Sequence, residues 1–193
     1  MESTTTHLLT AEEFYDFCQL PENRDRYFEL ESGEVVELNR PNIRHGVVCA
    51  NVVRILGNYV YDRQKGYVVS NDAGLIVERD PDTVNGPDVF LYDQSRPFEE
   101  LPFPYDEQLP ALIVEVLSPS DRLGKVIKRV TRFLDRGTSL VWVLDPEARN
   151  LTLYRPEQHP VVYEGTEEVT GFDVLPDLKI RVADFFATPG DAE

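Results

Sequence analysis

The segment Ala111–Asp121, ALIVEVLSPSD, constrains the fold more than any other part of the chain. Its first seven residues are apolar except for Glu115, and the Ser-Pro-Ser-Asp that follows is typical of a turn. The pattern predicts a buried strand over 111–117. Burying an ionised carboxylate costs free energy unless it is paired or bound to a metal. Glu115 is therefore either a site residue or a strand-end glutamate that faces solvent or a structural arginine.

The composition is that of a globular protein and limits the possible partners. A chain of 193 residues with 41% hydrophobic and 28% charged residues suits one domain with a full core. The formal net charge of −16 argues against a nonspecific nucleic-acid coat protein, because phosphate binding requires lysine and arginine. A nuclease stays possible, since a divalent cation in an acidic cleft reverses the local field.

The sequence also predicts the compartment. No apolar run has the length needed to cross a bilayer, and the N-terminus lacks the basic and long apolar regions of a signal peptide. Cys18 and Cys49 both fall in predicted helices, where they are expected to be small core residues in a reducing environment. We expect a cytoplasmic protein without a membrane partner.

Helix signals appear at four places. Thr10 and Glu13 form a capping-box signature for a helix that should end at Pro21. The clearest amphipathic pattern predicts a helix over 44–66, stopped by Gly66. The predicted helices are that N-terminal one, 44–66, 122–136 before Gly137, and a closing turn at 183–187.

Strand signals surround these helices and predict an α+β fold. The expected architecture is a single domain, 1–193, with a central mixed β-sheet flanked by helices, preceded by an N-terminal helix and a hairpin. Residues 1–9 are expected to be flexible and 94–110 to form a loop. The predicted strands are 27–30 and 34–38 as a hairpin, then 67–70, 75–78, 88–92, 111–117, 140–144 and 151–154, with weaker strands at 161–163 and 179–182.

A second candidate carboxylate, Asp88, opens the predicted strand 88–92. An aspartate at a strand start is often only a turn residue. If this strand lies beside the strand of Glu115, however, both carboxylates converge on one point. Two carboxylates with water suit Mg²⁺ or Mn²⁺, and the backbone carbonyl of Val116 offers a further oxygen.

The helix predicted at 122–136 carries four cations on one face. They stand at i, i+3, i+4 and i+7: Lys125, Lys128, Arg129 and Arg132. Such a face is usually just solvated. Because the helix begins directly after the turn that follows Glu115, a lysine of its first two turns can reach back over the carboxylates. An ammonium group there would orient a water molecule and stabilise charge on a phosphate.

These stretches resemble the Uma-type family of candidate restriction endonucleases, a branch of the PD-(D/E)XK nuclease superfamily. The resemblance implies a central mixed sheet flanked by helices and metal-dependent hydrolysis of phosphodiester bonds in nucleic acid, with DNA as the expected substrate. A homodimer is expected by analogy. The stretches that carry the resemblance cover nearly the whole chain in order: 27–38, 44–46, 86–93, 111–122, 138–156 and 174–186.

The resemblance assigns roles to four residues. Asp88 becomes the aspartate of the PD motif, and Glu115 becomes the first acid of the E-X-K signature. Glu29 matches an acid of the first hairpin that completes the metal site, although it is equally well read as an exposed strand glutamate. His45 matches the family's Arg-His-Gly and is a candidate general base or substrate contact, whereas a histidine at a helix start is more often structural.

One position departs from the family pattern. The E-X-K lysine would fall at position 117, where this chain has Leu117. In the family the lysine has moved into the following helix, at a position that aligns here with Arg129. Lys128 is the first candidate for its role and Lys125 the second, while Arg129 and Arg132 are predicted substrate contacts. Arg129 in the lysine's role, or a degraded site, are the remaining alternatives.

The resulting hypothesis is a nuclease in which Asp88, Glu115 and the Val116 carbonyl hold Mg²⁺ or Mn²⁺, with Glu29 in support. A second reading is a catalytically decayed nuclease fold that acts in binding or assembly, which the net charge favours. A third reading, a glycosidase, is weaker. It needs an aromatic sugar platform near Glu115, and the single tryptophan, Trp142, lies in a predicted core strand.

Overall fold

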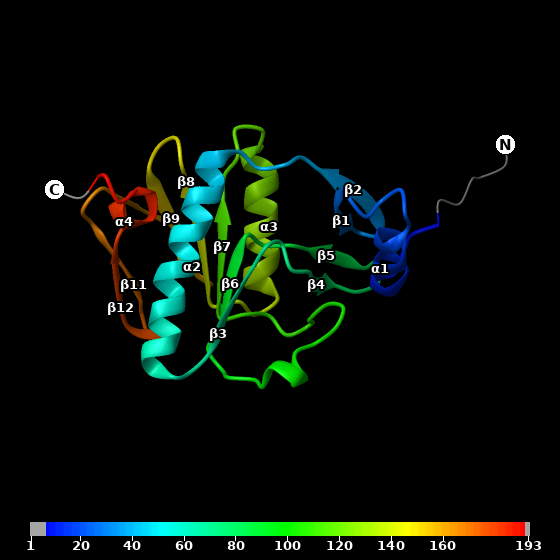
Figure 1. Ribbon diagram of the computed structural model, residues 1–193, viewed down its shortest axis with the longest axis horizontal. Helices are drawn as coiled ribbons and strands as arrows, with labels where there is room; N and C mark the ends of the chain where they lie inside the picture. The colour runs from blue at the N-terminus through cyan, green and yellow to red at the C-terminus, as the bar shows by residue number, and fades with distance from the viewer. Residues whose placement is uncertain (1–6, 192–193) are drawn as a thin grey trace.

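The computed structural model describes residues 7–191 and is built around a six-stranded mixed sheet (Figure 1). Its strands are β3 (Tyr67–Ser70), β6 (Val89–Tyr92), β7 (Leu112–Val116), β8 (Leu140–Asp145), β9 (Asn150–Tyr154) and β10 (Val161–Glu164). Their order is β10-β9-β8-β7-β6-β3. Only β7 and β8 are parallel among these neighbours. Such a pair requires a crossover connection, and a helix supplies it here.

Helices cover both faces of this sheet. Helix α2 lies on one face and α3, which connects β7 to β8, on the other (Figure 1). Side chains of the central strands alternate between these two layers: Leu112 and Val114 pack with α2, and Ile113 packs with α3. The helices are α1 (Ala11–Gln19), α2 (Ile43–Arg63), α3 (Leu123–Asp135) and α4 (Ala183–Phe186), with a 3₁₀ turn at Phe98–Glu100.

Two smaller sheets flank the central one (Figure 1). The N-terminal sheet has the order β2-β1-β5-β4 and packs against α1, and β11 pairs with β12 on the face that α2 covers. These strands are β1 (Tyr27–Glu31), β2 (Glu34–Leu38), β4 (Leu75–Glu78), β5 (Thr83–Asn85), β11 (Glu168–Gly171) and β12 (Leu175–Arg181). The mixed sheet, the flanking helices and the N-terminal hairpin confirm the predicted fold.

The local predictions succeeded where the signal was strong. Thr10 and Glu13 form both hydrogen bonds of the capping box. The prediction that Gly66 stops α2 is wrong: the helix ends at Arg63 and is followed by a left-handed Gln64, with φ of 50°. Strand β5 has no counterpart among the predicted strands, because its three residues are too few to show a period, although it pairs with both β1 and β4.

The chain's beginning was expected to be flexible over 1–9. Residues 1–6 lie outside the described residues, whereas the amide of Leu9 donates to the carbonyl of Gly33 at 2.9 Å. Within residues 7–191, no helix combines the length and the apolar character required to span a bilayer.

Candidate functional site

The two predicted carboxylates lie at the same end of two neighbouring strands. Strands β6 and β7 pair antiparallel with Val89 opposite Val114, and Asp88 and Glu115 are the next residues beyond that pair. Asp88 is close enough to Glu115 to raise its pKa. One oxygen of Asp88 also accepts a hydrogen bond from the Val116 amide at 2.7 Å. The expectation that the two strands are neighbours is confirmed.

Arg129 reaches this acid pair from the middle of α3. Its Nε donates to Glu115 at 2.9 Å, and its Nη1 donates to Glu29 at 2.8 Å. Only 21% of the Arg129 side chain is exposed. Although burial opposes the charged form, Glu115 and Glu29 raise the pKa of Arg129, so the guanidinium stays charged. At the position where the family has a lysine, this chain therefore has an arginine that joins two of the predicted metal ligands.

Glu29 is a buried member of the site. It comes from β1, has 5% of its surface exposed, and accepts a hydrogen bond from the Gly86 amide at 2.7 Å. The alternative of an exposed strand glutamate is wrong. Gly86 also accepts from Arg129 through its carbonyl at 3.0 Å. A Cβ on Gly86 would stand 2.5 Å from the carbonyl oxygen of Asp72, which explains why glycine is required at this junction.

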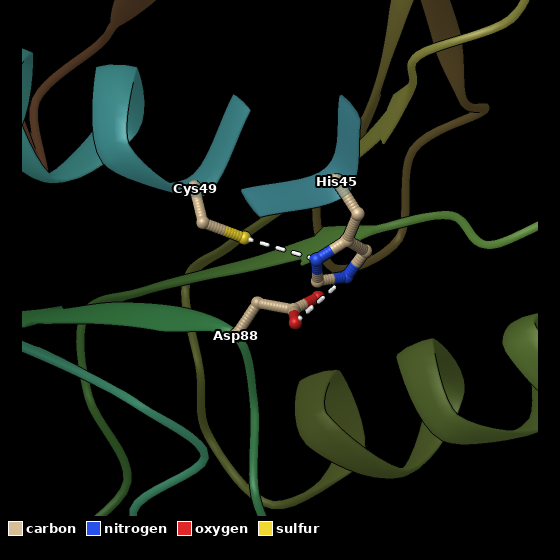
Figure 2. Close-up of side chains that lie close together, drawn as sticks. All are labelled: His45, Cys49 and Asp88. Carbon is tan, nitrogen blue, oxygen red and sulfur yellow. Dashed lines mark hydrogen bonds and ion pairs between the residues drawn. The ribbon is translucent and has the colours of Figure 1, made fainter. Parts of the chain in front are cut away.

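His45 holds Asp88 from the opposite face of the sheet. It lies in the first turn of α2, is buried, and places its Nε2 3.0 Å from an oxygen of Asp88 (Figure 2). Burial alone would lower the pKa of His45, but Asp88 outweighs it and the pKa is raised. Both Asp88 oxygens are thus engaged, one by His45 and the other by the Val116 amide. The imidazole orients the carboxylate.

Asp72 belongs to the same charge cluster and was missed in the sequence. It lies in the turn between β3 and β4, where desolvation and Asp88 raise its pKa. The only sequence signal was an acid in a turn, which is common in any protein.

The cluster has more negative than positive charge. Burial raises the pKa of Glu115, Asp88 and Glu29 raise it further, and Arg129 opposes them without cancelling the effect. Asp72 adds another carboxylate beside Asp88. An added cation would stabilise the ionised carboxylates of a cluster with this excess of negative charge.

The other cations of α3 lie elsewhere. Lys125 and Lys128 are exposed, and among the described residues no hydrogen bond or ion pair joins either lysine to the acid pair. The charge of Lys128 acts on Glu31 instead. Arg132 is buried and donates to Glu31 and to Asn85, an arrangement that turns its guanidinium away from solvent.

Leu117, where the resemblance would put the E-X-K lysine, packs into the apolar layer under α3. It also lines a pocket of about 210 Å³ together with Ser118 and Asp121. Neither Asp88 nor Glu115 lines this pocket. The acid pair therefore sits beside the pocket rather than at its floor.

Comparisons with known proteins agree with this fold. The sequence model of the Uma2 family, described as “Putative restriction endonuclease”, matches residues 11–183. The fold is similar to the crystal structure of “a putative nuclease belonging to DUF820 from Anabaena variabilis ATCC 29413”, with a TM-score of 0.77 and 21% sequence identity over 92% of this chain and 97% of that one. Among curated proteins, none matches this chain.

Proposed function

We propose that this chain, which belongs to the Uma2 family, is a divalent-metal-dependent endonuclease that hydrolyses phosphodiester bonds of DNA. The observation that carries the proposal is the position of Asp88 and Glu115 at the same end of two neighbouring antiparallel strands, inside a cluster with excess negative charge. Family membership supports a nuclease in general. The choice of DNA, of the metal and of the residues below is our proposal.

The residues fit a hard divalent cation. Asp88, Glu115 and Glu29 offer carboxylate oxygens and Val116 offers a backbone carbonyl, which is the donor chemistry that Mg²⁺ and Mn²⁺ prefer. When bound, such an ion polarises a phosphodiester oxygen and lowers the pKa of water. The net negative charge around Glu115 favours an added cation.

The protein's own residues supply positioning and charge. His45 and the Val116 amide fix the orientation of Asp88. Arg129, held by Glu115 and Glu29, takes the lysine's role and stabilises the charge that builds up on the phosphoryl oxygens. Its fork is less compact than an ammonium group, so we expect a slower enzyme than one with lysine.

Lys125 and Lys128 receive a different role from the one that the sequence pattern indicated. Both are exposed on α3 near the site, and we assign them to contacts with the nucleic-acid backbone. Arg132 is left out of the substrate contacts because Glu31 and Asn85 occupy its donors. The homodimer stays a prediction.

The second candidate function is a binding module that has lost catalysis. The observation that favours it is Arg129, whose guanidinium already neutralises two of the carboxylates proposed to bind metal. In that case the protein binds nucleic acid or a partner without cutting, and Mn²⁺ produces no rise in melting temperature.

The test is cleavage of supercoiled and linear duplex DNA by purified protein with Mg²⁺ or Mn²⁺, with single-stranded DNA and RNA in parallel. Asp88→Asn and Glu115→Gln should each abolish cutting, with folding checked by circular dichroism. The control is Asp121→Asn, which alters an exposed carboxylate near the end of β7 and should cut normally. Cutting that survives both site variants refutes the proposed site.

A further inference from the structure

A second group of potential metal ligands lies on the α2 side of the acid pair. His45 and Cys49 stand one turn apart on α2, and Asp88 faces them from the start of β6 (Figure 2). The three residues can each offer one ligand atom with all three atoms within 4.8 Å of one another. Among residues 7–191, this is the one group of three or more histidine, cysteine and acidic residues with such geometry.

We propose that His45, Cys49 and Asp88 form a binding site for a thiophilic divalent ion of the Zn²⁺ or Co²⁺ type. A sulfur, an imidazole nitrogen and a carboxylate oxygen form a ligand set that these ions accept and that Mg²⁺ does not prefer. The ligands of a tetrahedral zinc ion lie about 3.4–3.6 Å apart, from its bond lengths to sulfur, nitrogen and oxygen. Cys49 Sγ already lies 3.5 Å from His45 Nδ1, whereas the Asp88 oxygen lies 3.0 Å from the other ring nitrogen, Nε2. Asp88 therefore has to turn from Nε2 toward an ion held by Cys49 and His45.

The coordination would be incomplete without a further ligand. Three protein ligands leave one tetrahedral position open, as in catalytic rather than structural zinc sites. Asp72 adds negative charge next to the group, since it contributes to the raised pKa of both His45 and Cys49. We expect a reversible site whose open position a water molecule fills.

A nucleophilic role for Cys49 is less compatible with its surroundings. Cys49 contacts His45, and His45 contacts Asp88, as in a catalytic triad. However, burial, Asp88 and Asp72 all raise the pKa of the Cys49 thiol. A protonated thiol is a poor nucleophile. A bound cation would lower the pKa of the thiol, because it stabilises the thiolate, and the thiol proton would be released to solvent.

The site has a regulatory consequence that rests on the proposed function. Asp88 belongs both to the magnesium site proposed above and to the thiophilic site, and its two oxygens are engaged by His45 and Val116. An ion held by Cys49 and His45 draws Asp88 toward α2 and away from Glu115. Zn²⁺ should therefore inhibit Mg²⁺-dependent cleavage by competition for one carboxylate.

The binding proposal is tested with Co²⁺ alone, on the full chain without an affinity tag. Wild-type protein should give the thiolate-to-cobalt charge-transfer absorption in the near ultraviolet, saturating at one ion per chain. Cys49→Ser should lose that absorption, and Cys18→Ser should keep it. Cys18 is the matched control, because it is the chain's other cysteine and is partly buried in α1.

His45→Gln should weaken Co²⁺ binding at least about tenfold. Circular dichroism of each variant shows that the fold is retained. Absence of the charge-transfer band from wild-type protein overturns the proposal, and so does a band that persists in Cys49→Ser or disappears in Cys18→Ser.

The regulatory step has its own readout. Inhibition by Zn²⁺ is expressed relative to the uninhibited rate of each variant, and it should require more Zn²⁺ in Cys49→Ser than in wild-type protein or Cys18→Ser. Equal inhibition in all three overturns the competition. A wild-type protein that does not cut at all refutes the proposed function, whereas the cobalt spectra still decide the metal site.

Discussion

Replacing Arg129 by methionine tests whether the guanidinium holds the acid cluster together. The wild-type side chain makes three hydrogen bonds, to Glu115 at 2.9 Å, to Glu29 at 2.8 Å and to the Gly86 carbonyl at 3.0 Å. Removing one partner of a buried ion pair costs about 3–5 kcal/mol, because it leaves an uncompensated charge. For a domain of this length that corresponds to a fall in melting temperature of roughly 6–20 °C.

The loss should depend on pH in a defined direction. Without Arg129, Glu115 keeps the influences that raise its pKa, namely burial, Asp88 and Glu29. A carboxylate with a raised folded-state pKa destabilises the fold as pH rises from its unfolded pKa to its folded pKa. The pKa of Glu115 is already raised to about 8 in wild-type protein, chiefly by burial, and loss of Arg129 raises it further. The destabilisation of Arg129→Met relative to wild type should therefore grow above about pH 8 and be larger at about pH 9.5 than at about pH 7.

Urea unfolding followed by circular dichroism at both pH values measures the free energy of unfolding of wild type and variant. Lys128→Met is the control, since it removes an exposed cation from the neighbouring position of α3 and should change the free energy of unfolding by less than about 0.5 kcal/mol. A cost for Arg129→Met below about 1 kcal/mol, or one independent of pH, would refute the reasoning. A double-mutant cycle that combines Arg129→Met with Glu115→Gln measures the coupling free energy between these two side chains.

Three further predictions follow from other contacts of the site. Asp88→Asn should lower the pKa of His45, measured by NMR. In wild-type protein the ion pair of His45 with Asp88 stabilises the fold fully below the unfolded pKa of histidine, about 6.5, and this stabilisation is lost as pH rises through the raised folded pKa. Gly86→Ala should lower the melting temperature and weaken Mn²⁺ binding, because its Cβ would meet backbone and displace the Glu29 contact. Arg132→Met should cost about 1–3 kcal/mol in urea unfolding, because its partner Glu31 is partly exposed, yet leave Mn²⁺ affinity unchanged; a large loss of affinity would return Arg132 to the site.

Local sequence patterns determined much of the fold. The apolar run before Ser118 could only be satisfied in a strand covered on both faces, and Leu112 to Val114 are fully buried there. The capping box at Thr10 and Glu13 formed as predicted, because it needs only neighbouring residues. The resemblance to a family assigned Asp88 and Glu115 to one metal site, which no local pattern supplies.

Only the tertiary structure decided which cation meets the acids. Lys128 and Arg129 are adjacent in sequence and lie on the same broad helical face, but the rotation of α3 about its axis is set by the packing of Val130 and Phe133 in the core. That rotation turns Arg129 toward Glu115 and leaves Lys128 in solvent. The spacing of charges along the sequence cannot predict the rotation of α3, since a solvated lysine and a paired arginine fit the same helical periodicity.

Long-range contacts were equally inaccessible to the sequence. His45 and Cys49 are visibly one helical turn apart, but nothing in their spacing shows that Asp88 completes the group or that Asp72 lies beside it. Sequence determined the elements, because hydrophobic periodicity and capping act over a few residues. The assembled sheet decided the site, because its side chains come from six separate segments that only packing brings together.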